Sequence, residues 1–286
     1  MIFPRAAQTS AAVAGHYDEL DGFYREIWGE HVHHGYWATG RETPAQAADA
    51  LVWLLAERLH LSPRQKICDI GCGYGATAQM LAERHGVAVT GVTISAAQAT
   101  IAALRAPSRG ALDIRCKDWL QNDFPNASFD RAYAVESSEH MTNKQRCFAE
   151  AFRTLRPGGL LVVCAWLART DPRPWEVRHL LEPICREGRL PAMGDLPDYE
   201  ALLRQAGFEL LHVDDISRAV APTWAVCLRR IAGKMLTDRR YLRYLMNKNA
   251  GNRVFLLTIL RLLVAFRMGA MRYCVLTARK PVTATT

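Results

Sequence analysis

The sequence is poor in features that would indicate a membrane span, a signal peptide or a disulfide framework. Its eight cysteines are scattered and no two form a C-x-x-C pair, so we expect reduced thiols and no zinc site. The first twenty residues contain no apolar core of signal-peptide length. The longest apolar run, 254–266, is interrupted by Arg261 and is shorter than the roughly 18 residues needed to span a bilayer. We therefore expect a cytoplasmic protein without stable membrane insertion.

The excess of basic charge is not accompanied by a recognisable nucleic-acid-binding module. The formal net charge is +8, and much of the excess lies between positions 229 and 272. The basic residues of this stretch are Arg229, Arg230, Lys234, Arg239, Arg240, Arg243, Lys248, Arg253, Arg261, Arg267 and Arg272. Such a stretch can form a solvated helix face, make peripheral contact with an acidic membrane, or bind phosphate groups. We expect no nucleic-acid partner.

Histidine is concentrated at one place that lacks the other residues of a metal site. His31, His33 and His34 fall within four positions, but their spacing is unlike that of zinc sites and no Asp, Glu or Cys cluster lies nearby in sequence. We therefore expect no metal. The aromatic residues around them suit the wall of an apolar pocket with a few polar tips. The expected substrate-binding residues are Tyr24, Trp28, His34, Tyr36, Trp37 and Trp224.

The most informative stretch is 66–98, which predicts a strand, a glycine turn, a helix and a second strand. Ile67, Cys68 and Ile70 form a short apolar run typical of a strand that is buried on both faces. Three glycines follow at alternate positions, where the absence of a Cβ permits positive φ and the close approach of a ligand. A helix is expected over 76–85 and the second strand over 87–92. This pattern predicts the first βαβ unit of a doubly wound sheet, with a ligand at the carboxyl ends of its strands.

The motif D-I-G-C-G-Y-G resembles the nucleotide motif of class I S-adenosylmethionine-dependent methyltransferases, in which the Asp two residues before the first Gly belongs to the motif. The resemblance implies S-adenosyl-L-methionine as cofactor and S-adenosyl-L-homocysteine as product. It also implies that the methionine end is held by Asp69 and the turn that follows it. The turn residues concerned are Gly71, Cys72, Gly73 and Gly75. A dinucleotide-binding turn is the alternative, because its fingerprint tolerates the Ala76 found here.

Two further segments are expected to contact the cofactor. After the second strand come Thr93, Ile94 and Gln98, at the place where many nucleotide-binding domains carry a ribose-binding acid. The third strand, 112–116, is followed by Asp118 and Trp119, which suit recognition of the adenine amine and ring. Asp118 acting only as a helix N-cap is the alternative.

The catalytic candidates follow the fourth expected strand, 131–135. Glu136, Glu139 and His140 lie where groups at the carboxyl end of a parallel strand project into the site. Burial raises the pKa of a carboxylate and makes it a useful base for a carbon or phenol acceptor. Glu136 is the first candidate and is also placed in the cofactor site. The alternatives are that Glu136 only orients the amino group of the cofactor and that His140 only makes a structural hydrogen bond.

The remaining elements are read from periodicity, capping signals and glycine turns. Residues 1–16 are expected to be flexible, and Thr43-Pro44-Ala45-Gln46 is a capping box that starts a helix. The segment 170–195 is rich in Pro and charge and is interpreted as an inserted lid. Helices are expected over 18–28, 43–59, 144–155, 199–206, 223–249 and 252–269, and further strands over 160–165, 208–213 and 273–278.

Three further stretches narrow the resemblance to one family of these methyltransferases. WGEHVHHGYW at 28–37, VESSEHM at 135–141 and the ending RYCVLTARKP are similar to segments of the γ-tocopherol methyltransferase family, and the R-P-G-G turn at 156–159 is a landmark of the class I enzymes. Thr223-Trp224 departs from the bulkier aromatic of the plant enzymes, which favours a specialised metabolite over vitamin E. The resemblance implies C-methylation of a lipophilic quinol, phenol or isoprenoid-type acceptor. The alternatives are an isoprenoid diphosphate, held by the basic stretch, and N- or O-methylation of a natural product.

These observations predict an α/β fold with a doubly wound, Rossmann-like, seven-stranded sheet and an inserted, mainly helical lid. At 286 residues the chain can bury one sizeable core beside a small lid. We expect an N-terminal cap and pocket segment at 1–42 and the cofactor-binding core at 43–168. The lid and sixth strand are expected at 169–270, and the final strand and tail at 271–286.

Overall fold

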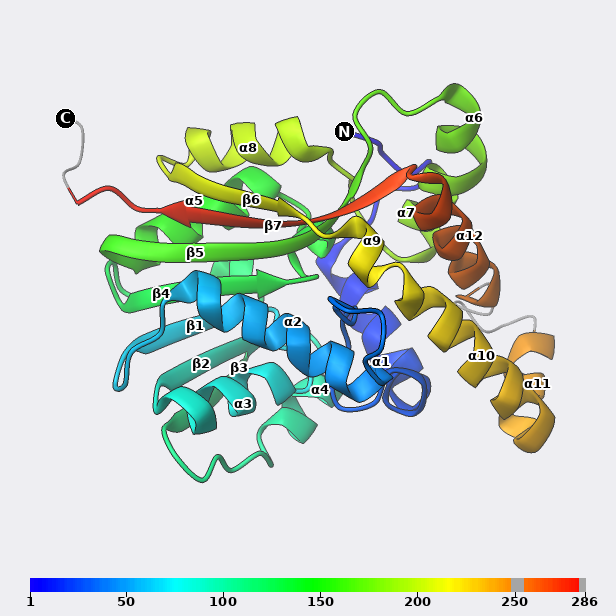
Figure 1. Cartoon of the computed structure of the whole chain (residues 1–286), viewed down its shortest axis with the longest axis horizontal. Helices are drawn as coiled ribbons and strands as arrows, with labels where there is room; N and C mark the ends of the chain where they lie inside the picture. Colours follow the sequence, from blue (N-terminus) through cyan, green and yellow to red (C-terminus); the bar gives the residue numbers. More distant parts are fainter. Residues whose placement is uncertain (248–254, 283–286) are drawn as a thin grey trace.

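The computed structural model describes residues 1–247 and 255–282, and its centre is a mixed seven-stranded sheet of order β3-β2-β1-β4-β5-β7-β6 (Figure 1). The first five strands are parallel, and β7 runs antiparallel to both β5 and β6. The strands are β1 (Lys66–Ile70), β2 (Ala88–Thr93), β3 (Ala111–Cys116), β4 (Phe129–Val135), β5 (Leu155–Ala168), β6 (Glu209–Asp215) and β7 (Met271–Arg279). The α/β, doubly wound architecture expected from the sequence is confirmed.

Helices cover both faces of the sheet and its carboxyl end. The long ones are α1 (Ser10–Trp28), α2 (Pro44–Leu59), α3 (Ala76–His85), α4 (Ala96–Ala102), α5 (Lys144–Thr154), α8 (Leu196–Gln205), α10 (Pro222–Thr237), α11 (Arg239–Met246) and α12 (Phe255–Met268). The short ones are η1 (Trp119–Gln121), η2 (Ser138–His140), α6 (Pro174–Glu176), η3 (Val177–Leu181), α7 (Glu182–Glu187) and α9 (Ser217–Val220). Figure 1 shows α1 and α10–α12 gathered at the end of the sheet where the parallel strands finish.

The sheet separates two apolar cores. On one face, buried residues of α2 and α3 pack against β1 and β2, and this core continues into α10 and α12. On the other face, α5 and α8 pack against β4, β5 and β7. Because each helix buries one apolar stripe against the sheet, the polar ends of the strands remain free to form a site.

The prediction that residues 1–16 are flexible is wrong. Helix α1 begins at Ser10 rather than Asp18, and Thr9 caps it by accepting a hydrogen bond from the Ala12 N–H. Ile2 pairs with Met193 through two backbone hydrogen bonds. The first residues therefore have tertiary partners that local composition does not reveal.

The prediction of a single helix over 223–249 is also wrong, because the helix breaks at Asp238, which ends α10 and caps α11. The R-P-G-G segment lies inside β5, and Gly158 within it has φ 77°. The pairing with β4 is irregular there, because Leu155 pairs with Phe129 but Leu160 pairs with Arg131. The capping box at Thr43 and Gln46 is confirmed. Part of the expected C-terminal region lies outside the described residues. This part comprises positions 248–254 of the two expected helices, which include Lys248 and Arg253, and positions 283–286 of the tail.

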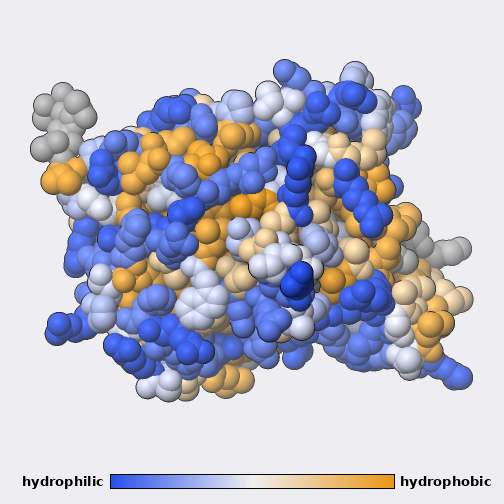
Figure 2. All heavy atoms as spheres, in the orientation of Figure 1, coloured by the Kyte–Doolittle hydropathy of each residue, from blue (hydrophilic) through white to orange (hydrophobic). Residues whose placement is uncertain are grey.

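The described helices include none that is long and apolar enough to cross a membrane. Exposed apolar side chains instead gather at the end formed by α10 and α11, where Figure 2 shows them beside charged residues. Leu236 and Met246 are the most exposed of them. Among the basic residues nearby, Lys234 and Arg240 both form ion pairs with Glu26.

Candidate active site

The glycine turn after β1 holds the conformation that its sequence predicts. Gly71, Gly73 and Gly75 all have positive φ, and Gly75 begins α3. A Cβ built on Gly71 would lie less than 3.0 Å from the Cβ of Ser137, which follows β4. The ends of these two neighbouring strands are therefore packed so closely that only glycine fits.

A pocket of about 750 Å³, counting its part open to solvent, runs along the carboxyl ends of the parallel strands. It brings together most of the residues expected to bind the cofactor: Gly71, Gly73, Thr93, Ile94, Gln98, Asp118, Trp119 and Glu136. An adjoining hollow is lined by Asp69 and Cys72 and shares Gly71 and Gly73 with the first. This elongated shape suits a ligand that lies across several strand ends.

Asp69 is a buried carboxyl in the adjoining hollow, beside the glycine turn. The Tyr133 hydroxyl donates a 2.8 Å hydrogen bond to its Oδ2. Burial raises the pKa of Asp69 to about 7, although the bond from Tyr133 acts in the opposite direction. A buried carboxylate with one protein donor is suited to hold the ammonium group of an amino acid, because that cation would replace its lost hydration.

Cofactor affinity is therefore expected to depend on pH through Asp69. Because only the ionised form attracts an ammonium group, the Kd for S-adenosylhomocysteine should rise as the pH falls below about 7, by about tenfold per pH unit. Titration calorimetry between pH 5.5 and 8.5 measures this, and Asp69→Asn should flatten the profile. Tyr133→Phe should move its midpoint to higher pH, because the bond that lowers the pKa is lost. A flat wild-type profile would contradict the role of Asp69.

Asp118 and Trp119 line the first pocket just after the end of β3. Asp118 caps η1 through a 2.9 Å bond from the Leu120 N–H, so it does act as an N-cap. Its second oxygen accepts from the Ser10 hydroxyl on α1 at 2.9 Å, and the residue also lines the pocket. The N-cap role of Asp118 is compatible with the predicted contact to adenine, which stays a prediction.

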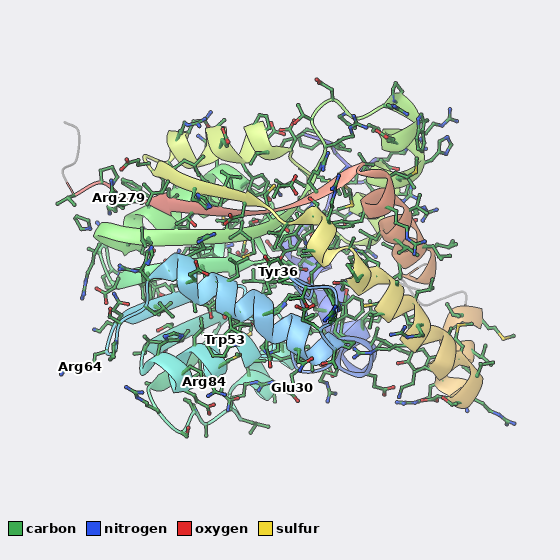
Figure 3. The ribbon with its side chains drawn as sticks, in the orientation of Figure 1. Glu30, Tyr36, Trp53, Arg64, Arg84 and Arg279 are labelled. Atoms are coloured by element: carbon green, nitrogen blue, oxygen red, sulfur yellow. The ribbon has the colours of Figure 1, made fainter. Side chains whose placement is uncertain are left out.

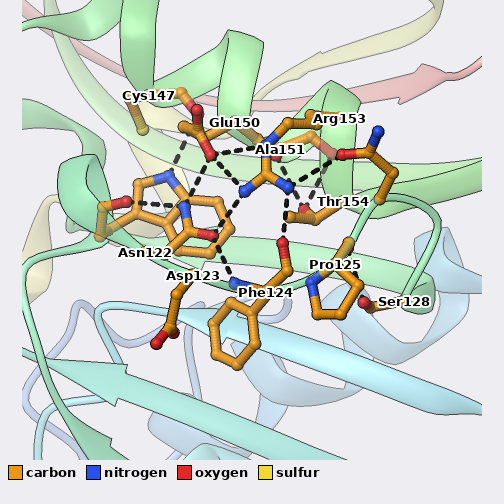
Figure 4. A network of polar contacts seen from close by, with 12 residues as sticks. Asn122, Asp123, Phe124, Pro125, Ser128, Cys147, Glu150, Ala151, Arg153 and Thr154 are labelled. Atoms are coloured by element: carbon orange, nitrogen blue, oxygen red, sulfur yellow. Dashed lines mark hydrogen bonds and ion pairs between the residues drawn. The ribbon is translucent and has the colours of Figure 1, made fainter.

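The segment that carries Trp119 is anchored by a polar network on α5 (Figure 4). The Trp119 indole donates to the Cys147 carbonyl at 3.1 Å, and the Asn122 amide donates to the Glu150 carboxylate at 2.9 Å. Arg153 bonds to both Glu150 and Asn122. Because these bonds fix both sides of η1, Trp119 is held rigidly at the edge of the pocket.

Helix α1 supplies site residues that the sequence reading missed. Ser10, Val13 and Tyr17 line the cofactor pocket from one face of this helix. Asp18 accepts hydrogen bonds from the Ser95 hydroxyl and the Ala97 N–H, at the end of β2 where no acid was found in the sequence. The spacing of Ser10, Val13 and Tyr17 at i, i+3 and i+7 was the available signal, but it requires the helix to begin at Ser10.

Glu136 is an ionised carboxylate that three donors hold in place. It accepts from the His34 backbone N–H at 2.6 Å, from His34 Nδ1 at 2.9 Å and from the Tyr273 hydroxyl at 2.9 Å. Burial acts to raise its pKa, but the neighbouring His34 imidazole and these bonds leave the pKa below its usual value. Its backbone has φ 52°, so a strained conformation aims the side chain at His34. Such a carboxylate, whose two oxygens are already occupied by three donors, is a good anchor.

Glu139 is placed away from the pocket cavities. It is buried, and it accepts from the Trp166 backbone N–H at 2.8 Å and from the Ser138 hydroxyl at 3.0 Å. Burial raises its pKa to about 8, and the Lys144 ammonium lies close by, bonded to the Glu139 carbonyl at 2.9 Å. This geometry holds the end of β5 and favours a structural role.

His140 lies at the junction of the cofactor pocket and a second pocket of about 540 Å³. Its Nε2 is 2.9 Å from the Tyr17 hydroxyl. Burial lowers the pKa of His140 to about 3, so the imidazole is neutral at physiological pH. Tyr17, Val32, Glu136 and His140 line both pockets, which places them where a methyl group would pass from one ligand to the other.

The second pocket has an aromatic lining. The expected residues Tyr24, Trp28 and Trp224 line it, and Trp166 and Leu262 join them. His34 lies behind Glu136 and is almost fully buried. The described part of the lining includes no Lys or Arg. In that composition the pocket matches a neutral, lipophilic ligand.

Tyr36 and Trp37 lie outside the residues that line either pocket. The Tyr36 N–H donates to the Ala47 carbonyl at 2.7 Å beside α2 (Figure 3), and the Trp37 indole donates to the Glu42 carbonyl at 3.0 Å. The expectation that they contact the acceptor therefore gains no support from this geometry.

Comparisons with known proteins agree with this arrangement. The family model described as mycolic acid cyclopropane synthetase matches residues 5–270. The chain is 32% identical to 27-O-demethylrifamycin SV methyltransferase of Amycolatopsis mediterranei, covering 93% of this chain and 95% of that protein. It is 29% identical to the chloroplastic tocopherol O-methyltransferase of Arabidopsis thaliana, covering 94% and 82%. Among solved structures, the [4+2]-cyclase SpnF is similar, with 29% identity, a TM-score of 0.77 and coverage of 99% and 100%. The chain belongs to the mycolic acid cyclopropane synthetase family of class I S-adenosylmethionine-dependent methyltransferases and resembles the γ-tocopherol methyltransferases within it.

Proposed function

We propose that this S-adenosylmethionine-dependent methyltransferase acts on a neutral, lipophilic phenol or quinol, at a hydroxyl oxygen or at the adjacent ring carbon. The observation that carries the proposal is the junction of two pockets at Glu136 and His140. One pocket follows the strand ends, and the other is aromatic and free of Lys and Arg among its described residues. The names of two relatives, tocopherol O-methyltransferase and 27-O-demethylrifamycin SV methyltransferase, support this substrate class.

A diphosphate acceptor is less well supported. A diphosphate needs several cationic donors, preferably guanidinium groups in bidentate contact. Arg230 donates to the Ile27 and Trp28 carbonyls, and Arg261 pairs with Glu187. These arginines of the basic stretch thus stabilise the packing of the helices, and neither lines the acceptor pocket.

The chain's own residues have distinct tasks in such a reaction. The cofactor supplies the electrophilic methyl group, and the protein orients the acceptor for in-line attack and excludes water. Trp28 and Trp224 hold the aromatic ring of the acceptor and shield it from solvent. His140, neutral and hydrogen-bonded to Tyr17, is placed to take the proton from the oxonium or arenium ion that methyl transfer leaves on the acceptor, which is acidic enough for a weak base. Glu136 stays ionised and keeps His34 in position.

Transfer of a labelled methyl group tests this proposal. Purified protein is incubated with methyl-labelled S-adenosylmethionine and either a pool of phenols and quinols or a pool of prenyl diphosphates. Label is expected in the first pool, and NMR of the product distinguishes an O-methyl from a C-methyl group. His140→Ala should lower kcat by about 10²- to 10³-fold while the affinity for S-adenosylhomocysteine stays within about threefold. Label confined to the diphosphate pool would refute the proposed acceptor class.

A further inference from the structure

Four buried nitrogen atoms beside the acceptor pocket have no side-chain hydrogen-bond partner among the described residues; one is Nδ1 of His140, and the other three belong to neighbouring rings. These three are Nε2 of His34, Nε1 of Trp166 and Nε1 of Trp224. A buried polar atom that stays unpaired costs about 1–3 kcal/mol, so one is uncommon and three together are not expected without a ligand. His34 is 1% exposed and Trp224 is 4% exposed, so solvent does not satisfy them.

The three rings form one cluster. The His34 ring centroid lies 4.9 Å from that of Trp224 and 6.0 Å from that of Trp166, and the two indoles are 6.1 Å apart. Both tryptophans line the acceptor pocket, together with Glu136. The residues come from the segment after α1, the end of β5 and the first turn of α10. The fold thus brings three distant segments together, with both indoles in the pocket lining and His34 directly behind them.

Each of the three residues is anchored at its ring, its backbone or its neighbour by a bond made elsewhere. An ionised carboxylate only accepts hydrogen bonds, so the bond to Glu136 requires the proton of His34 to sit on Nδ1. The opposite nitrogen, Nε2, then points away from Glu136. The Trp166 backbone is fixed by Glu139, and the Gly35 N–H donates to the Thr223 hydroxyl at 3.1 Å, next to Trp224. The cluster is therefore preorganised before a ligand arrives.

We propose that these three nitrogens form a subsite for a hydroxyl group of the acceptor. A hydroxyl donates one hydrogen bond and accepts two. It can therefore accept from the Trp166 and Trp224 N–H groups and donate to His34 Nε2, which is an acceptor when the ring carries only the Nδ1 proton. A carbonyl would leave His34 without a donor, and a carboxylate would meet the negative charge of Glu136. The inference rests on the second pocket being the acceptor pocket, and it defines which polar group that pocket selects.

Direct binding tests the subsite without any turnover. The probes are 1-naphthol and 1-methylnaphthalene, which have similar size but differ in the hydroxyl, and the protein is saturated with S-adenosylhomocysteine. Calorimetry should show that the wild-type protein binds 1-naphthol at least tenfold more tightly than 1-methylnaphthalene, because the methyl compound leaves all three nitrogens unpaired.

Variants that remove a single N–H group identify the subsite. Trp224→Phe and Trp166→Phe keep an aromatic ring but lose the donor, so each should reduce the naphthol preference by about three- to tenfold. Trp53→Phe is the matched control, since Trp53 lies half-exposed on α2, far from the pocket lining, and should keep the wild-type preference (Figure 3). Unchanged affinity for S-adenosylhomocysteine in each variant shows that the protein is folded.

Two results would overturn the subsite. One is a wild-type protein without a preference for 1-naphthol, including one that binds neither compound. The other is a preference that survives in both pocket variants. Neither result depends on methyl transfer, so a failure of the subsite is distinguishable from a failure of the proposed substrate class, which the labelled-methyl experiment decides.

Discussion

Replacement of Gly71 by alanine is expected to abolish measurable cofactor binding and to lower the stability of the protein. The new Cβ would overlap the Cβ of Ser137, and Gly71 has φ 86°, which an L-residue adopts only with strain. Ser137 cannot easily retreat, because its hydroxyl is hydrogen-bonded to the Ile70 carbonyl at the end of β1. Overpacking costs about 1–3 kcal/mol and the backbone strain about 1–2 kcal/mol more. Both effects distort the turn that the cofactor must contact.

Gly73→Ala is the matched control for this prediction. Gly73 has φ 52°, within the left-handed region, and a Cβ built on it meets no atom within 4 Å. It should therefore reduce cofactor affinity, because the methyl group enters the pocket, while the Tm without ligand falls less than in Gly71→Ala, because the backbone strain remains but the overlap with Ser137 is absent. Thermal unfolding without ligand and titration with S-adenosylhomocysteine separate the two effects. A Gly71→Ala protein with wild-type Tm would show that the strand ends can move apart.

Glu136→Gln is expected to lower kcat/KM for the acceptor by about 10²- to 10³-fold. The carboxylate of Glu136 accepts from three buried donors, whereas an amide presents its own N–H groups to at least one of them. Each mismatched buried donor costs about 1–3 kcal/mol, so His34 loses its fixed orientation. The affinity for S-adenosylhomocysteine should change by less than about threefold. An equal loss of cofactor affinity would instead support the alternative that Glu136 orients the cofactor.

A second substitution tests the cause of this loss. Tyr273→Phe removes one of the three donors, and its hydroxyl meets the same Glu136 oxygen as the His34 N–H. In the Glu136→Gln background this change should cost less than in the wild type, because a mismatched donor disappears. The Tm of the four proteins in this double-mutant cycle gives the coupling between the two positions. Strictly additive effects would show that the Tyr273 bond does not hold the carboxylate.

The cofactor side of the site could be predicted from the sequence because its residues are close in the chain. Gly71 and Gly73 lie within one βαβ unit, Thr93 ends the second strand of that unit, and Asp118 follows the neighbouring strand β3. Parallel strands end at one edge of the sheet, so the order of the elements alone brings these residues together. The pocket that they line confirms their proximity and leaves their individual contacts with the cofactor as predictions.

The acceptor side could not be assigned in the same way, because it depends on the direction of side chains from distant segments. Proximity in sequence grouped His34 with Tyr36 and Trp37, but the chain turns these side chains toward different neighbours. Trp166 gave no signal, since an aromatic residue near the end of a buried strand is normally part of the core. Tyr17 was missed because α1 was expected to begin only at Asp18.

The position of β7 in the sheet has a consequence for the order in which the protein assembles on the ribosome. Strands β1 to β4, with the glycine turn and most of the cofactor pocket, are synthesised within the first 140 or so residues. Strand β7 is made more than a hundred residues later, yet it inserts between β5 and β6 and carries Tyr273 to Glu136. A nascent chain can therefore form the cofactor half early, while the acceptor half, and with it methyl transfer, must wait for β7.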